Sequence, residues 1–198
     1  MKKGNKWEDH YSRRAKQEKW LARSVYKLQE IDKRYRLVRR GDRVLDLGCY
    51  PGSWSQYLLK AAGKRGQVVG LDLLEPIHVR AANFRFIKGD IHSIDIRWLV
   101  EEIGPRDSVL SDLAPKTTGA RATDAIRSLE LAEKAMAIAI ALLRHQGHFL
   151  CKVFEGEEVK GFREALSHYF GDTRAVRPAA VRKGSKEIYM LGLRFEGG

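Results

Sequence analysis

Apolar positions along the chain follow two alternating periods. Short apolar runs that fit strands alternate with longer segments whose apolar residues recur at helical spacing. Strands are predicted over 43–47, 67–72, 84–87, 108–112 and 148–154, and helices over 24–38, 53–62, 94–103, 123–145 and 159–170. Residues 173–178 and 187–195 are predicted to pair as closing antiparallel strands. This order is typical of an α/β fold, with a mostly parallel twisted sheet and helices on both faces.

The length and composition fit one folded domain. The 198 residues show no internal repeat, low-complexity segment or linker, so we expect a single domain over 1–198, with 1–40 as a basic N-terminal helical extension. The longest apolar run, Ala135–Leu143, is less than half a membrane span, and the first residues lack the apolar stretch of a secretory signal. Cys49 and Cys151 cannot build a disulfide scaffold and are interpreted as small packing residues. A cytoplasmic protein without a membrane partner is expected.

Positive charge is concentrated at the two ends of the chain. The chain carries 37 Lys and Arg against 25 Asp and Glu, a net charge of +12. Residues 1–40 contribute a net +9 and residues 171–198 a net +3, whereas residues 41–170 are balanced. Basic charge gathered in this way indicates a polyanion-binding surface, and nucleic acid is the favoured partner. A solvated basic tail without a partner is the alternative.

The first predicted strand leads into a helix through a turn that contains glycine, Gly48-Cys-Tyr-Pro-Gly52. Glycine lets the backbone approach a ligand closely. The spacing is neither the G-x-G-x-x-G of dinucleotide-binding proteins nor a P-loop, which requires G-K-[ST]. An adenosine ligand without phosphates fits this turn better, and S-adenosylmethionine is the common example.

Four aspartates lie at or just beyond the ends of predicted strands: Asp46, Asp72, Asp90 and Asp112. Parallel sheets bind ligands at these carboxyl ends. Asp72 is placed to accept hydrogen bonds from a ribose, Asp90 to lie near an adenine, and Asp112 to lie near the methylsulfonium. Trp54 is a candidate wall of the pocket. For any one aspartate alone, a helix cap or a turn is the better interpretation, and only their joint placement indicates a cofactor site.

Three charged residues lie in apolar surroundings: Lys152 inside a predicted strand, Glu187 at the start of another, and Lys27 in a helix. Loss of hydration favours the neutral form of a lysine, which a general base for an alcohol nucleophile needs. Asp112 and Glu187 would hold the two amines in place. The alternative is a lysine whose stem packs while its ammonium reaches water. That alternative is the better interpretation of Lys27 alone, and for Lys152 the two are balanced.

Five segments occur in order: Arg23–Leu28 (RSVYKL), Asp46–Gln56 (DLGCYPGSWSQ), Ser111–Pro115 (SDLAP), Cys151–Phe154 (CKVF) and Arg182–Tyr189 (RKGSKEIY). Together they resemble the FtsJ/RrmJ-type RNA ribose 2′-O-methyltransferases, and the resemblance extends from about residue 10 to residue 195. It implies a Rossmann-like methyltransferase fold that uses S-adenosylmethionine and no metal.

The resemblance also implies the site residues. The catalytic Lys-Asp-Lys-Glu tetrad of the family falls on Lys27, Asp112, Lys152 and Glu187, and its cofactor contacts fall on Gly52, Trp54, Asp72, Asp90 and Asp112. The chain departs from the family pattern at two positions. Ser53 stands where a second glycine is usual, which bears on the fit of the cofactor. Lys116 stands where asparagine is usual, and a lysine there could add a phosphate contact at the substrate mouth.

The substrate that the resemblance implies is RNA. A short chain of this kind is similar to bacterial members that methylate a uridine of 23S ribosomal RNA in the large ribosomal subunit, and we expect a monomer. Candidate phosphate contacts are Lys2, Lys3, Lys6, Arg13, Arg14, Lys16, Lys19, Arg23, Arg177, Arg182 and Lys183, and candidate stacking residues are Trp7, Tyr11 and Trp20, although packing is favoured for Trp20. Another RNA such as tRNA, or a non-catalytic role in ribosome assembly, stays open.

Overall fold

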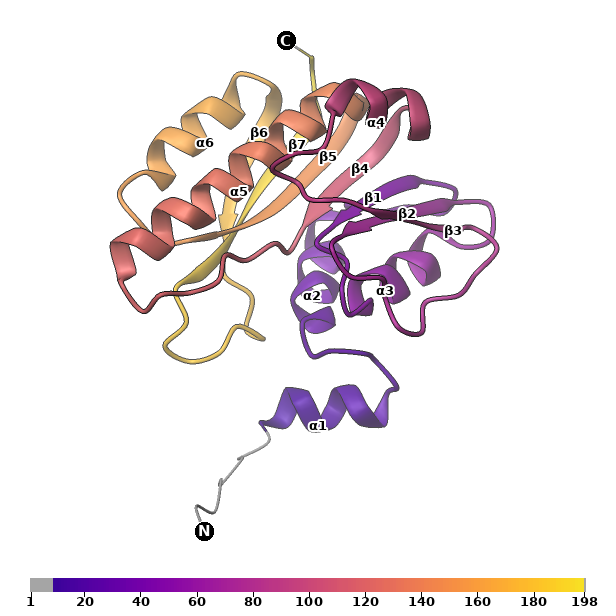
Figure 1. Ribbon diagram of the computed structural model, residues 1–198, viewed down its shortest axis with the longest axis horizontal. Coiled ribbons are helices and arrows are strands. Elements are labelled where there is room, and N and C mark those ends of the chain that lie inside the picture. Colours follow the sequence, from indigo (N-terminus) through magenta and orange to yellow (C-terminus); the bar gives the residue numbers. More distant parts are fainter. Residues whose placement is uncertain (1–8, 198) are drawn as a thin grey trace.

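A seven-stranded sheet runs through the middle of the structure, a computed structural model that describes residues 9–197 (Figure 1). Its strands are β1 (Arg43–Leu47), β2 (Gln67–Asp72), β3 (Phe84–Lys88), β4 (Arg106–Ser111), β5 (Leu143–Phe154), β6 (Phe170–Val176) and β7 (Glu187–Phe195). They lie in the order β3-β2-β1-β4-β5-β7-β6. Strand β7 pairs antiparallel with both of its neighbours, and every other pairing in this sheet is parallel. The predicted fold class is confirmed.

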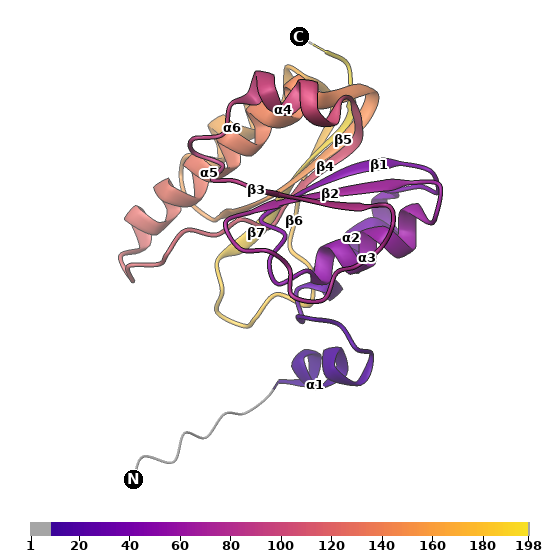
Figure 2. The same ribbon diagram turned by 45° about the vertical axis from the view of Figure 1, so that its right-hand side comes forward.

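Helices cover both faces of the sheet. They are α1 (His10–Gln17), α2 (Val25–Tyr35), α3 (Ser53–Ala62), α4 (Ile96–Ile103), α5 (Arg121–Leu142) and α6 (Val159–Ser167). Helices α2 and α3 pack on one face, and α4, α5 and α6 pack on the other (Figures 1 and 2). Helix α1 lies outside these layers, where Ala15 packs with Tyr26 and Ala180. Of the expected extension 1–40, helix α1 is therefore attached outside the layer, whereas α2 is itself part of the layer.

The alternation of side chains along β5 decides where its lysine lies. Phe149, Cys151 and Val153 pack in the core under α5 and α6, whereas Leu150 packs in the core under α2 and α3. Successive strand residues point to opposite faces, so Lys152 lies on the α2/α3 face. In the antiparallel register Lys152 is opposite Tyr189, a fully buried member of the α2/α3 core. The side chains of Lys152 and Tyr189 thus lie side by side at the carboxyl end of the parallel strands, on the α2/α3 face.

Some predicted boundaries were wrong, for identifiable reasons. Helix α4 begins at Ile96 rather than at residue 94, because the Asp95 side chain caps it by accepting from the N–H of Arg97 at 2.8 Å. Helix α5 ends at Leu142, and Leu143 already pairs with Arg106, so β5 begins five residues earlier than expected. The helix predicted over 159–170 ends at Ser167, and the helix predicted over 24–38 ends at Tyr35.

Both cysteines, Cys49 and Cys151, are buried and free. Within residues 9–197, no helix combines the length and the apolar character needed to cross a membrane.

Candidate active site

Lys152, Asp112 and Tyr189 form a hydrogen-bonded cluster at the carboxyl ends of β4 and β5. The Lys152 Nζ donates to the main-chain oxygen of Asp112 at 2.7 Å and to its Oδ1 at 3.0 Å. The hydroxyl of Tyr189 donates to the same Oδ1 at 2.7 Å. Lys152 is only 7% exposed. The cluster therefore holds the Lys152 Nζ rigidly, with one of its three hydrogen-bonding positions left for a substrate.

A second ion pair lies next to this cluster. Lys27, which α2 carries, pairs with Glu187 at the start of β7, and their side chains are 12% and 15% exposed. The Lys27 Nζ lies 5.9 Å from the centroid of the Tyr189 ring. The four predicted tetrad residues are thus brought together as two ion pairs, with Tyr189 in contact with both. Their catalytic roles stay a prediction.

The electrostatics of the cluster keep its carboxylate charged. Burial raises the pKa of Asp112, but the cations Lys152 and Lys27 and the hydrogen bond from Tyr189 outweigh it, so this pKa lies below its ordinary value. Burial, together with the carboxylates of Asp112 and Glu187, raises the pKa of Tyr189 well above its ordinary value. At neutral pH Asp112 is an anionic anchor and Tyr189 is a neutral donor.

Sequence reasoning did not identify Tyr189 as a site residue. Residues two apart on a strand share a face, so the spacing of Glu187 and Tyr189 was the available signal.

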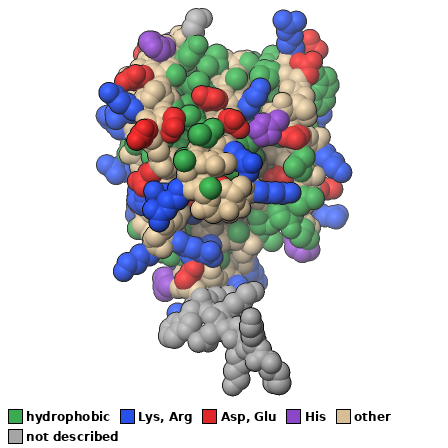
Figure 3. All heavy atoms as spheres, turned by 60° about the vertical axis from the view of Figure 1, so that its left-hand side comes forward, with side chains coloured by type: hydrophobic (Ala, Val, Ile, Leu, Met, Phe, Trp, Pro, Cys, Tyr) green, Lys and Arg blue, Asp and Glu red, His purple; other side chains and the backbone are tan. Residues whose placement is uncertain are grey.

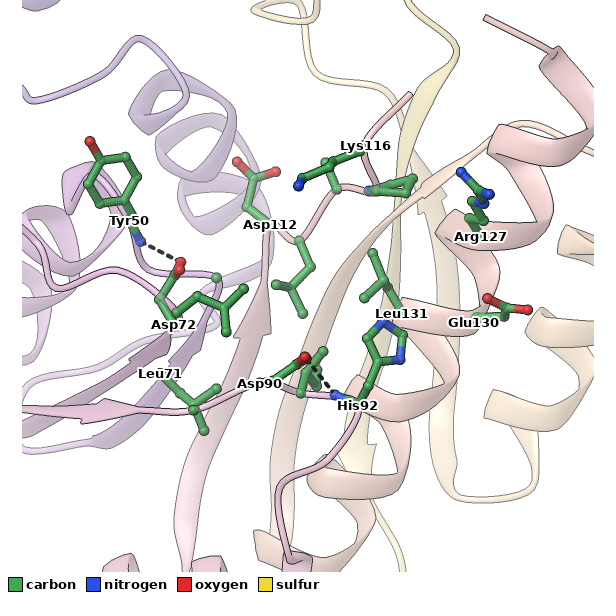
Figure 4. Close-up of a pocket in the computed structure, with 17 residues that line it drawn as sticks. Tyr50, Leu71, Asp72, Asp90, His92, Asp112, Lys116, Arg127, Glu130 and Leu131 are labelled. Carbon is green, nitrogen blue, oxygen red and sulfur yellow. Dashed lines mark hydrogen bonds between the residues drawn. The ribbon is translucent and has the colours of Figure 1, made fainter. Parts of the chain in front are cut away.

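A cavity of about 650 Å³ opens beside Asp112 at the carboxyl ends of the parallel strands (Figure 4). Asp72, Asp90 and Asp112 line it together with Gly48. Its size is within the roughly 300–1,000 Å³ of small-molecule sites. Gly48 has φ +78°, and a Cβ there would lie 2.8 Å from the Leu113 Cδ2. Glycine is therefore required for this turn to form the cavity wall.

The carboxylates of the cavity suit a nucleoside that carries a positive charge. Asp72 accepts from the N–H groups of Tyr50 at 2.9 Å and Leu74 at 3.1 Å, and Asp90 accepts from the N–H of His92 at 3.0 Å. These bonds fix both carboxylates, and each oxygen keeps a lone pair for a ligand hydroxyl or amino group. Four carboxylates and two cations line the cavity, namely Asp72, Asp90, Asp112 and Glu130 against Lys116 and Arg127. The excess of negative charge disfavours phosphates and attracts a sulfonium, so the residues fit S-adenosylmethionine.

Gly52 and Trp54, the other two predicted cofactor contacts, are not among the residues that line the cavity. Trp54 is 3% exposed, and its Nε1 donates to the main-chain oxygen of Ser24 at 3.0 Å. A Cβ at Gly52 would lie 2.4 Å from the Val79 Cγ2, so this glycine serves close packing of the turn. The structure places both residues behind the cavity wall, and a direct cofactor contact by either stays a prediction.

Asp46 is buried beneath the same turn. The Ser55 hydroxyl donates to its Oδ2 at 2.6 Å, and its Oδ1 has no hydrogen-bond partner among the residues described. Burial raises the pKa of Asp46 to about 7, and the nearby carboxylates Asp112 and Asp72 contribute, against the lowering effect of Ser55. Asp46 therefore supports the cofactor turn from below in a form that is partly protonated near neutral pH.

Replacing Asp46 with asparagine is expected to remove a pH dependence of stability. The pKa of Asp46 is about 7 in the folded state, against an ordinary value of 3.8. The protonated Asp46 therefore stabilises the folded state fully below about pH 4, and this stabilisation is lost as the pH rises towards 7. The stabilisation is on the order of 4 kcal/mol. The free energy of unfolding, measured with urea, should fall more between about pH 4.5 and about pH 7.5 in the wild type than in the variant. Equal losses in both proteins would contradict this.

Predicted RNA contacts also gather beside the tetrad. A hollow of about 490 Å³ next to the Lys27–Glu187 pair is lined by three of them, Arg23, Arg182 and Lys183. The chain thus brings basic residues from its two ends to one place.

Several candidate RNA contacts, Arg23 among them, also make contacts inside the fold. Arg23 pairs with Asp9 and donates to the main-chain oxygen of Ala180 at 2.5 Å. Contacts within the protein also engage Arg14 with Glu18, Tyr11 with Tyr26, Trp20 with Lys60, and Arg177 with Glu155. Lys2, Lys3, Lys6 and Trp7 lie outside the described residues. The basic extension therefore serves to attach α1 as well as to present charge.

The two departures from the family pattern have different surroundings. The hydroxyls of Ser53 and Ser24 lie 2.9 Å apart, so Ser53 ties α3 to the residue before α2. Ser24, the residue before α2, makes this bond and no side-chain cap hydrogen bond. Lys116 lines the same cavity as Asp112 (Figure 4). Among residues 9–197, no group of three or more His, Cys, Asp or Glu side chains is placed to hold a metal ion.

Comparison with known proteins identifies the family of this chain. A protein of Bdellovibrio bacteriovorus named ribosomal RNA large subunit methyltransferase E is 46% identical to this chain, and the match covers 93% of this chain and 95% of the relative. A protein of the same name from Desulfosudis oleivorans is 45% identical, and the match covers 96% of this chain and 92% of the relative. A solved structure from Plasmodium falciparum, described as a ribosomal RNA methyltransferase, is 26% identical with a TM-score of 0.79, over 90% of this chain and 100% of that one. The family of FtsJ-like methyltransferases matches residues 20–195. The chain belongs to the FtsJ-like methyltransferases.

Proposed function

We propose that this protein transfers the methyl group of S-adenosylmethionine to the ribose 2′-hydroxyl of a uridine in 23S ribosomal RNA, within the large ribosomal subunit, as a cytoplasmic monomer. The observation that carries the proposal is that Asp112 belongs to both halves of the site. It lines the cofactor cavity, and it holds the Lys152 Nζ at 2.7 and 3.0 Å. The names of relatives that match nearly the whole chain support the choice of RNA.

The residues of the cavity divide the work of binding and transfer. When bound, S-adenosylmethionine supplies an electrophilic methyl group on a sulfonium. Asp72 and Asp90 hold its nucleoside, and Asp112 lies between this ligand and the basic cluster. Lys152 orients the ribose hydroxyl and accepts or steers its proton, while Asp112 and Tyr189 fix its position. Much of the acceleration comes from this positioning, because a sulfonium is already a good leaving group.

The hollow beside Lys27 holds the target nucleotide. Arg23, Arg182 and Lys183 surround it next to the Lys27–Glu187 pair. Contacts of this kind to phosphate groups supply affinity and orientation without reading the base sequence. RNA binding is accordingly expected to weaken as the salt concentration rises.

The test is transfer of labelled methyl from S-adenosylmethionine to unmodified large ribosomal subunits, free 23S RNA and tRNA in parallel, with the label located by nucleotide mapping. Label on a uridine 2′-oxygen of the subunit is the expected result. Label on tRNA alone would keep the chemistry and replace the substrate. Cofactor binding by calorimetry without label on any RNA would overturn the proposal in favour of a non-catalytic assembly role.

A further inference from the structure

A second basic hollow lies at the opposite edge of the sheet from the active site. It has a volume of about 720 Å³ and is enclosed by the turn before β1, the end of α3 and the segment before β3. Its four cationic lining residues are Arg40, Lys60, Lys64 and Arg65, all exposed, and no Asp or Glu of residues 9–197 lines it. The face seen in Figure 3 differs, because acidic and basic side chains are interspersed there.

The turn 63–66, which carries Lys64 and Arg65, is held in place by neutral contacts. The Asn83 Nδ2 donates to the main-chain oxygens of Gly63 at 3.0 Å and Gly66 at 2.9 Å. The Arg40 guanidinium packs on the same turn, since a Cβ at Gly63 would lie 3.4 Å from its Nη1. The nearby Asp42 carboxylate accepts from the N–H of Arg39 at 2.6 Å and does not line the hollow. These contacts fix the backbone of the turn that presents Lys64 and Arg65 to the hollow.

Helix α3 lies between the active site and this hollow, and the segment 20–24 packs along it. The segment 20–24 runs antiparallel to this helix: the hydroxyls of Ser24 and Ser53 lie 2.9 Å apart, and the N–H of Leu21 donates to Gln56 Oε1 at 3.0 Å. At the far end, the Lys60 Nζ lies 4.0 Å from the centroid of the Trp20 ring. Helix α3 spans about 15 Å from the cofactor turn to the hollow. Helix α3 and the segment 20–24 thus extend from one basic hollow to the other.

We propose that this second hollow binds the phosphate backbone of the RNA substrate at a distance from the methylated ribose. The proposal rests on the proposed function, which supplies the RNA. Several exposed cations surround the hollow, and no carboxylate of the described residues lines it. The hollow therefore suits the successive phosphate groups of an RNA backbone. A contact there would fix the direction in which the RNA leaves the active site.

The test compares two triple variants in RNA binding. Arg40→Gln/Lys64→Gln/Arg65→Gln removes three charges of the hollow, and Arg97→Gln/Lys134→Gln/Lys160→Gln removes three exposed charges from α4, α5 and α6 on the other face of the sheet. Filter binding to an unmodified 23S RNA transcript over a salt series should show at least a tenfold weaker affinity for the first variant. Its plot of log affinity against log salt should be shallower by about 2. The second variant should match the wild type within a few-fold.

Equal affinities and salt slopes for the two triple variants would overturn this site. Thermal unfolding and the single variants Lys64→Gln and Arg65→Gln check that a loss of binding follows the charge and not misfolding. Methyl transfer gives an independent measure, in which the first variant should raise KM and leave kcat unchanged. If the wild type binds RNA through the hollow but transfers no methyl group, the proposed function fails and the binding site stands.

Discussion

Replacing Lys152 with methionine should slow methyl transfer at least 100-fold while changing the affinity for S-adenosylmethionine less than about twofold. The Lys152 Nζ is fixed by two hydrogen bonds to Asp112, and it is the group of the cluster with a free position for the substrate hydroxyl. Lys152 is not among the residues that line the cofactor cavity. Methionine has a similar length and volume, so the core around β5 should keep its packing.

Single-turnover methyl transfer to RNA and calorimetric titration of S-adenosylmethionine measure the two effects separately. Lys134→Met is the matched control, because Lys134 is an exposed lysine of α5 on the far face of the sheet. The control should retain wild-type rates. Turnover by Lys152→Met within a few-fold of the wild type would remove Lys152 from the mechanism.

The parts of the fold predicted correctly depend on local periodicity. The apolar run 149–154 indicated a buried strand, and a lysine inside such a strand must find a polar partner. Strand β2 ends at Asp72 and strand β4 ends just before Asp112, close to the ends of the corresponding apolar runs in the sequence. Because parallel strands end at one edge of a sheet, the carboxylates of the cofactor cavity could be assigned to one place before any distance was known.

Features that arise from tertiary contacts could not be predicted in this way. The boundary between α5 and β5 lies inside an apolar run, where Leu143 leaves the helix because it pairs with Arg106. The basic hollow combines Arg40 with Lys64 and Arg65, which lie in a stretch without net charge. The net charge of successive segments therefore identifies the basic ends of the chain. It does not identify a basic patch whose residues come together only on folding.

Replacing Asp112 with asparagine should reduce both catalysis and stability. Asparagine keeps the size of the side chain but removes the charge that compensates Lys152, whose side chain is 6% exposed against 16% for Asp112. Breaking a buried ion pair costs roughly 3–5 kcal/mol, and the partial exposure of Asp112 places the expected loss near the lower end, at about 3 kcal/mol. Methyl transfer should fall about 100-fold or more, because the Lys152 Nζ loses an anchor. Urea unfolding at pH 7 and single-turnover transfer measure the two losses.

The double variant Asp112→Asn/Lys152→Met distinguishes the structural role of the pair from its chemical role. Removing both charges leaves no uncompensated ion, so the double variant should recover at least about 1 kcal/mol relative to the sum of the single variants. Activity should not recover, because the group that takes the proton is absent. The pH dependence gives a further check: the pKa of Asp112 is lowered by folding. Its contribution to stability is therefore present above about pH 4 and is lost at lower pH, and this acid sensitivity should be weaker in Asp112→Asn. Strictly additive losses of stability would show that the two side chains do not act as a pair.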